Sequence, residues 1–202
     1  MTAILISRIV DDGADDLYIF ADQRITSDDT VLSNHNKKIF SFPPNNIRPY
    51  KRHYVTVGDV PPTDYILHKL EAINDTESLY QFIMESEVFT KMPHNAAIYM
   101  INERPGVPEI ILLEKYEDWT GTRTIDMEEL KERPLFDGSG GLYVQVALDA
   151  LLSVVEHPYQ DLVLLAFSAA AGSITSMNDR VSVVKIPIPV RKIRKSRAKG
   201  KE

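Results

Sequence analysis

The order in which two kinds of apolar pattern follow each other most restricts what this chain can fold into. Short apolar runs rich in β-branched residues, typical of strands, come first, and two segments with apolar residues every three to four positions follow them. A second block of strand-like runs, two more helical segments and a last strand-like run complete the chain. Because strands and helices come in blocks, neither a regular βαβ alternation nor an all-β fold is expected. The sequence therefore predicts an α+β fold with segregated sheets and helices.

The strand predictions rest on short apolar runs separated by turn residues. Residues 3–10 and 17–21 flank an Asp- and Gly-rich turn at residues 11–16, which predicts a hairpin at the start of the chain. Residues 31–33 and 38–42 are expected to pair with each other in a second hairpin. Further strands are predicted at residues 54–58, 96–101, 109–114 and 181–186.

Four helices are predicted from the three-to-four spacing of apolar residues. The first is expected to start at residues 63–64 and the second at residues 74–75, because Thr, Asp and Asn are favourable helix caps. The other two are expected at residues 142–155 and 159–171, and residues 126–132 are expected to form a solvated helical turn. The inward face of the second helix is predicted to consist of Leu79, Phe82, Ile83 and Met84.

Composition excludes several classes of site. The chain has 202 residues, 44% of them hydrophobic and 26% charged, which suits one globular domain. It contains no cysteine, so disulfides, thiol catalysis and Cys-based zinc sites are excluded, and its five histidines lack the spacing of metal ligands. There is no apolar run of about 20 residues that would span a membrane, and the N-terminus lacks the basic start of a signal peptide. A cytoplasmic protein is therefore expected.

Residues 190–202 differ in charge from the rest of the chain and are predicted to form a flexible tail after a single domain at residues 1–189. They carry seven of the 23 basic residues and one of the 29 acidic ones, so residues 1–189 have a net charge of about −12 against −6 overall. Such a tail suits binding to nucleic acid or to an acidic partner. It is also consistent with a solvated terminus or with contact to the acidic body of the chain itself. Because that body is acidic and no basic face with interleaved aromatic residues is present, nucleic-acid binding is not expected.

Four separated motifs together resemble a known family. They are Met1-Thr2, the segment from Phe20 to Thr26 that closes the second strand, Asn36-Lys37-Lys38-Ile39, and Gly138-Ser139-Gly140-Gly141 at the start of a helix. Their order and spacing resemble the proteasome β subunits and, more closely in layout, the peptidase subunit of the bacterial two-component ATP-dependent protease. These proteins are N-terminal nucleophile (Ntn) hydrolases. The resemblance extends over most of residues 2–187 and implies a four-layer αββα sandwich.

The resemblance implies that Thr2 is the nucleophile once Met1 has been removed. An N-terminal threonine supplies a hydroxyl group and, on the same residue, a free α-amine. That amine has an ordinary pKa of about 7.7–8.0, so it can accept the hydroxyl proton near neutral pH. Methionine aminopeptidase favours a small second residue, which suits Thr2. The alternative is that Thr2 simply begins the first strand.

Asp22 and Lys38 match the aspartate and lysine that support the nucleophile in this family. A buried ammonium group near the threonine lowers the pKa of that residue and stabilises developing negative charge. A buried lysine without a partner tends to lose its proton, so the aspartate and the lysine stabilise each other. The alternative is an ordinary surface ion pair, with Lys37 facing solvent by strand alternation.

Ser139 and Gly58 complete the residues carried over from the family. Ser139 matches a serine whose hydroxyl group relays a proton near the threonine amine, although a serine at this point could equally be a helix N-cap. Gly58 is the local counterpart of the residue whose backbone N–H stabilises the oxyanion. The next residues depart from the family, because Pro61 and Pro62 remove N–H donors at the substrate edge. Residues 170–180 also lack the Asp and Ser that proteasomes carry before the last strand.

Two functions remain open on this resemblance. The first is a threonine peptidase in a homo-oligomeric ring that cleaves peptides or unfolded proteins, with no cofactor or metal and with an ATPase unfoldase as a further partner. The second is a catalytically inactive structural or assembly subunit of the same fold. Retained Thr2, Asp22 and Lys38 favour the peptidase, and the altered substrate edge favours the inactive subunit.

Overall fold

The computed structural model describes residues 3–11, 13–27, 30–33, 37–58, 69–85, 96–115, 120–174, 177 and 179–189. The predictions for Thr2, for the start of the first helix at residues 63–64 and for the tail at residues 190–202 lie outside these residues.

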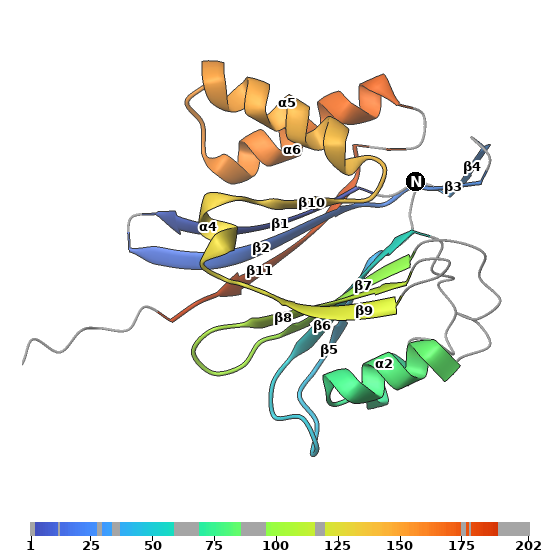
Figure 1. The fold of residues 1–202 in the computed structure, drawn as a ribbon. Coiled ribbons are helices and arrows are strands. Elements are labelled where there is room, and N and C mark those ends of the chain that lie inside the picture. Colours follow the sequence, from blue (N-terminus) through green and yellow to red (C-terminus); the bar gives the residue numbers. More distant parts are fainter. Residues whose placement is uncertain are drawn as a thin grey trace, which may run out of the picture.

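The first sheet has four antiparallel strands in the order β10-β1-β2-β11. β1 (Ile4–Asp11) pairs with β2 (Ala14–Asp22) along its whole length, which confirms the predicted first hairpin. β11 (Val181–Pro187) pairs with the other edge of β2, whereas β10 (Leu135–Asp137) pairs only with the first three residues of β1. The start of β1, the end of β2 and the end of β10 therefore meet at one end of the sheet (Figure 1).

The second sheet has five antiparallel strands in the order β5-β6-β7-β8-β9. They are β5 (Ile39–Phe42), β6 (Arg52–Gly58), β7 (Ala96–Asn102), β8 (Glu109–Lys115) and β9 (Thr120–Ile125), the last of which was not predicted.

The predicted second hairpin is wrong, because β5 pairs with β6 and not with the strand before it. β4 (Thr30–Ser33) pairs instead with β3 (Ile25–Ser27) in a separate two-stranded sheet. The side chains of β5 explain why this strand pairs with β6. Ile39 is 2% exposed in the core between the two large sheets, and Phe40 packs on the opposite face, so β5 is apolar on both faces and needs the neighbour that β6 provides.

The helices agree largely with their predicted positions. Residues 69–72 are helical, and α2 (Thr76–Glu85) is capped by Asp75, whose Oδ1 accepts the backbone N–H of Ser78 at 2.8 Å. Leu79 is fully buried as predicted, but Met84 is 44% exposed. At about 100° per residue, Met84 points roughly 140° away from Leu79, so both cannot face the sheet. α5 (Gly141–Val154) and α6 (Tyr159–Ser173) confirm the last two helices.

The turn at residues 126–132 is less solvated than predicted. It contains the short helix α4 (Glu129–Glu132), and Met127 and Leu130 are buried in the core between the large sheets. α4 contacts β1, where the Arg8 guanidinium donates a hydrogen bond to the carbonyl of Met127 at 3.2 Å and forms an ion pair with Glu128 at 2.6 Å. This segment therefore closes the edge of the sandwich beyond β10.

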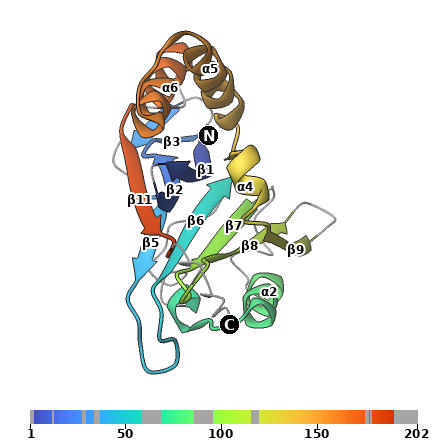
Figure 2. The same ribbon diagram turned by 90° about the vertical axis from the view of Figure 1, so that its left-hand side faces the viewer.

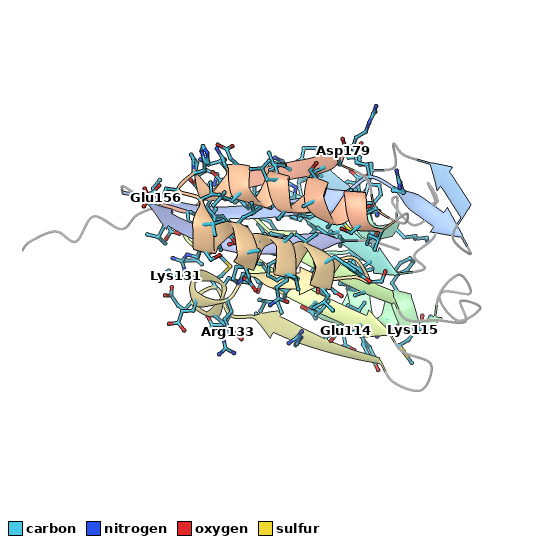
Figure 3. All side chains as sticks on the ribbon, turned by 90° about the horizontal axis from the view of Figure 1, so that it is seen from above. Glu114, Lys115, Lys131, Arg133, Glu156 and Asp179 are labelled. Atoms are coloured by element: carbon cyan, nitrogen blue, oxygen red, sulfur yellow. The ribbon has the colours of Figure 1, made fainter. Side chains whose placement is uncertain are left out.

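The elements stack in four layers, as the family resemblance implied. α5 and α6 cover the outer face of the first sheet, the two large sheets face each other, and α2 lies on the outer face of the second sheet (Figures 1 and 2). Figure 3, seen from above, shows α5 and α6 side by side over the first sheet, with the labelled Lys131 and Arg133 beyond them at one edge. No helix in the described part of the chain is long and apolar enough to span a membrane.

A row of three polar side chains lies on the inner face of the second sheet, near the start of β6. Nδ1 of His53 lies 2.7 Å from Oγ of Ser41, and Nε2 of His53 lies 2.7 Å from Oε1 of Glu103. Serine, histidine and glutamate also occur together in hydrolytic sites, but the His53 side chain is 0% exposed. Because a fully buried imidazole cannot reach a substrate, we assign this row a structural role.

Burial lowers the pKa of His53, although its hydrogen bond to Glu103 opposes this effect. The unfolded chain, with an ordinary histidine pKa of about 6.5, therefore takes up the proton first as the pH falls. We expect the free energy of unfolding to decrease below pH 6.5 by roughly 1 kcal/mol per pH unit from this group. His53→Gln, which cannot titrate, should show a smaller decrease in urea unfolding experiments between pH 7.5 and 5.5. Equal decreases in the two proteins would contradict this assignment.

Candidate active site

A buried ion pair lies at the end of the sandwich where β1 begins. Nζ of Lys38 is 2.7 Å from Oδ1 of Asp22, and the two side chains are 6% and 0% exposed. Lys37, the neighbouring lysine, is exposed. An ordinary surface pair is therefore excluded, since both charges are removed from water and each one depends on its partner.

The pair joins the two sheets. Asp22 is the last residue of β2 in the first sheet. Lys38 directly precedes β5 in the second sheet, and its carbonyl oxygen accepts the backbone N–H of Thr56 on β6 at 3.3 Å. The end of β2 and the segment before β5 therefore place one charge each at the same point between the two sheets.

The carboxylate of Asp22 also holds the start of β1. The backbone N–H of Ala3 donates to Oδ1 of Asp22 at 2.8 Å, and the N–H of Asp22 donates to the carbonyl of Ala3 at 3.1 Å. Oδ2 of Asp22 accepts the backbone N–H of Arg24 at 3.2 Å. The carboxylate thus receives donors from Ala3, Lys38 and Arg24. Thr2 lies outside the described residues, but a single peptide bond ties it to the Ala3 nitrogen that Asp22 holds.

The environment of Lys38 changes its acidity. Burial lowers the pKa of Lys38, while the charge and hydrogen bond of Asp22 act in the opposite direction. The ion pair with Asp22 favours the charged form, which can stabilise nearby negative charge, while burial makes Lys38 give up its proton more readily than an exposed lysine does. Both properties suit a group that assists a proton-transfer reaction.

The Gly-Ser-Gly-Gly segment packs against the same start of β1. Gly138 has a φ of +80°, which favours glycine, and the N–H of Gly141 donates to the carbonyl of Gly138 at 2.9 Å to form a turn. A methyl group added to Gly140 would lie 2.9 Å from Cβ of Ala3. Only a glycine therefore lets the turn approach Ala3 this closely.

Ser139 is exposed on this turn and is not a helix cap. The N-cap of α5 is Gly140, and no side chain makes a capping hydrogen bond there. The helix-cap interpretation of Ser139 is therefore wrong. The turn brings the segment that carries Ser139 next to the side chain of Ala3, whose backbone contacts Asp22.

Gly58 lies at the same end of the second sheet. It is the exposed last residue of β6, pairs with Ala96 and has a φ of +83°. Gly58 is two residues after Thr56, whose backbone N–H donates to the carbonyl oxygen of Lys38. The Pro61-Pro62 segment lies outside the described residues.

Two residues at this end of the molecule, Tyr99 and Asp137, were not predicted from the sequence. The hydroxyl group of Tyr99 donates to Oδ2 of Asp137 at 2.5 Å, and Oδ1 of Asp137 accepts the N–H of Gly138, also at 2.5 Å. Asp137 therefore contacts the first residue of the turn directly. The available signal was an acidic residue immediately before Gly138, but nothing in the sequence points to Tyr99 as its partner.

Two antiparallel sheets between helical layers form a four-layer αββα sandwich, with a buried Asp–Lys pair and a glycine turn at the start of the first strand. No known family model matches the chain, and no curated protein sequence is significantly similar to it. Solved structures, in contrast, match almost the whole chain.

Two of these structural neighbours illustrate the similarity. The eukaryotic HslV from Trypanosoma brucei has a TM-score of 0.57 and 16% identity, and the match covers 92% of this chain and 99% of that one. The Thiobacillus denitrificans BPH has a TM-score of 0.60 and 13% identity, over 94% and 99% of the two chains. BPH in complex with epoxomicin matches equally well, with a TM-score of 0.60 and 15% identity over 94% and 100%. This chain therefore has the fold of HslV and BPH.

Removing either member of the ion pair is expected to have unequal effects. Asp22→Ala leaves the buried Lys38 ammonium without its counter-charge and should lower the free energy of unfolding by about 3–5 kcal/mol. Lys38→Met should cost less, because the Asp22 carboxylate keeps the N–H donors of Ala3 and Arg24. Chemical denaturation of both variants measures the difference.

Lys37→Met is the matched control, since Lys37 is exposed and its replacement should change the free energy of unfolding by no more than about 0.5 kcal/mol. A cost for Asp22→Ala as small as that of the control would contradict the burial of the pair.

Proposed function

We propose that this protein is a threonine peptidase that uses Thr2 as its nucleophile once Thr2 is the first residue of the mature chain. The observation that carries the proposal is the buried carboxylate of Asp22, which binds both the Lys38 ammonium and the N–H of Ala3, the residue next to Thr2. A free α-amine and a hydroxyl group on Thr2 would then stand beside a buried cation.

In the proposed reaction, the α-amine of Thr2 accepts the proton of the Thr2 hydroxyl group while the oxygen attacks the carbonyl carbon of a peptide bond. Lys38 stabilises the negative charge that develops on the nucleophile, and Asp22 keeps Lys38 in place and charged. The peptide C–N bond breaks as the leaving amine takes the proton. Water then hydrolyses the ester on Thr2 and restores the free enzyme.

Two further groups have roles in this proposal. The backbone N–H of Gly58 stabilises the oxyanion of the tetrahedral intermediate, and the left-handed conformation of this glycine ends β6 beside the Lys38 segment. Ser139 relays a proton near the amine of Thr2. Its exposed position on a turn packed against Ala3 is compatible with that role.

The similarity to HslV and BPH also supports a proposal about assembly and substrates. We infer that the chain forms a homo-oligomeric ring and cleaves peptides or unfolded proteins, with an ATPase unfoldase as a further partner. The domain at residues 1–189 would form the ring, and the basic tail at residues 190–202 would remain outside the folded core. A cytoplasmic location is consistent with this assignment.

Replacement of the nucleophile tests the activity. Protein prepared with Thr2 as its first residue is expected to hydrolyse fluorogenic peptide amides, and Thr2→Ala should lose at least about 10³-fold in kcat, since the covalent step is no longer available. Thr2→Ser keeps both a hydroxyl group and the α-amine and should retain measurable turnover. Steady-state kinetics of the three proteins provide the comparison.

Unchanged turnover in Thr2→Ala would overturn the proposal. The absence of turnover in all three proteins, with normal folding and assembly, would favour the alternative of an inactive structural or assembly subunit. Addition of one residue before Thr2 serves as a second control, because it blocks the α-amine without altering the hydroxyl group.

A further inference from the structure

We propose that Tyr99 and Asp137 form a positioning bridge that fixes the Gly138–Gly141 turn against the start of β1. The inference rests on the proposed function, because it assigns the bridge to the positioning of the groups around Thr2. Neither residue is expected to touch the substrate.

The bridge crosses the core from one sheet to the other. Tyr99 lies on β7 in the second sheet, is 1% exposed and packs in the core between the sheets. Asp137 is the last residue of β10 in the first sheet and stands directly opposite Ile4 of β1 in the strand register. Asp137, which accepts the hydrogen bond from Tyr99, therefore lies opposite Ile4, the residue next to Ala3.

The turn needs such a restraint because its strand is poorly anchored. β10 is an edge strand of three residues, and among the described strands it pairs with β1 alone. Short edge strands have few ladder hydrogen bonds and open easily. The two hydrogen bonds of Asp137, one from Tyr99 and one from Gly138, add a side-chain link at the point where β10 becomes the turn.

The environment of Tyr99 favours a lasting hydrogen bond from its hydroxyl group to Asp137. Burial, together with the charge of Asp137, raises the pKa of Tyr99 well above its usual range. The phenol therefore stays protonated at neutral pH and can donate its hydrogen bond to Asp137. Both oxygens of Asp137 accept a donor, so this carboxylate is placed to hold the turn and not to transfer protons to a substrate.

The bridge affects the site through the position of the Gly138–Gly141 turn relative to Ala3. Gly138 takes its left-handed conformation next to Asp137, and two residues later Gly140 packs against Ala3. A shift of the turn would change the contact with Ala3 and hence the position of the groups on both sides of it. Misplacement by about 1 Å typically costs roughly 100-fold in rate.

Tyr99→Phe tests the bridge while retaining the aromatic ring. In protein with Thr2 as its first residue, we expect kcat for peptide amides to fall roughly 10- to 100-fold while KM changes less than about twofold. Asp137→Ala should have a similar effect. The double variant should be no worse than the single ones, because the two residues act as one unit. Tyr80→Phe on α2, in the opposite outer layer, is the matched control and should retain full activity.

Amide hydrogen exchange gives a readout that does not depend on activity. The amides of the turn, in particular that of Gly141, should exchange faster in Tyr99→Phe than in the unmodified protein, while the amides of β6 remain protected. If the unmodified protein shows no turnover, the proposed function fails, and amide hydrogen exchange is then the test of the bridge. Unchanged exchange in the turn, or an unchanged kcat in an active enzyme, would overturn the bridge.

Discussion

The ion pair between Asp22 and Lys38 is the interaction on which the rest of this end of the molecule depends. Two charges removed from water are tolerated only as partners, so the end of β2 and the segment before β5 must stay together for the fold to persist. The same carboxylate accepts the N–H of Ala3 and thereby holds the start of β1 in position. One buried group therefore couples the packing of the two sheets to the placement of the residue proposed to carry out the chemistry.

The sandwich concentrates its specialised residues where strands of both sheets end. β2 ends at Asp22, β6 ends at Gly58, and β10 ends at Asp137 before the glycine turn. Apart from the row of Ser41, His53 and Glu103, mainly apolar side chains fill the space between the sheets over the remainder of their length. A rigid core with polar groups at its rim favours precise positioning, because the backbone that carries each group is held by strand pairing on at least one side.

Much of this arrangement could be predicted from the sequence, and the failures have physical causes. The first hairpin, the last two helices and the α+β class follow from local periodicity, whereas the four-layer arrangement and the pairing of Asp22 with Lys38 were implied by the family resemblance. The pairing of β5 with β6 depended on which neighbour could cover both apolar faces, which local patterns do not reveal. The three-residue β10 is too short for periodicity to detect. Tyr99 and Asp137, 38 residues apart, meet only through the packing of the two sheets.

Asp22 holds Ala3 at the start of β1 so that Thr2, one residue earlier, can act as the proposed nucleophile. The most direct test of this role is to treat protein whose first residue is Thr2 with a covalent threonine-directed inhibitor and to locate the adduct by peptide mass spectrometry. We expect one inhibitor molecule per chain, attached to Thr2, with much slower labelling in Asp22→Asn. No adduct on Thr2 in the correctly processed, folded protein, or an adduct confined to another residue, would contradict this role.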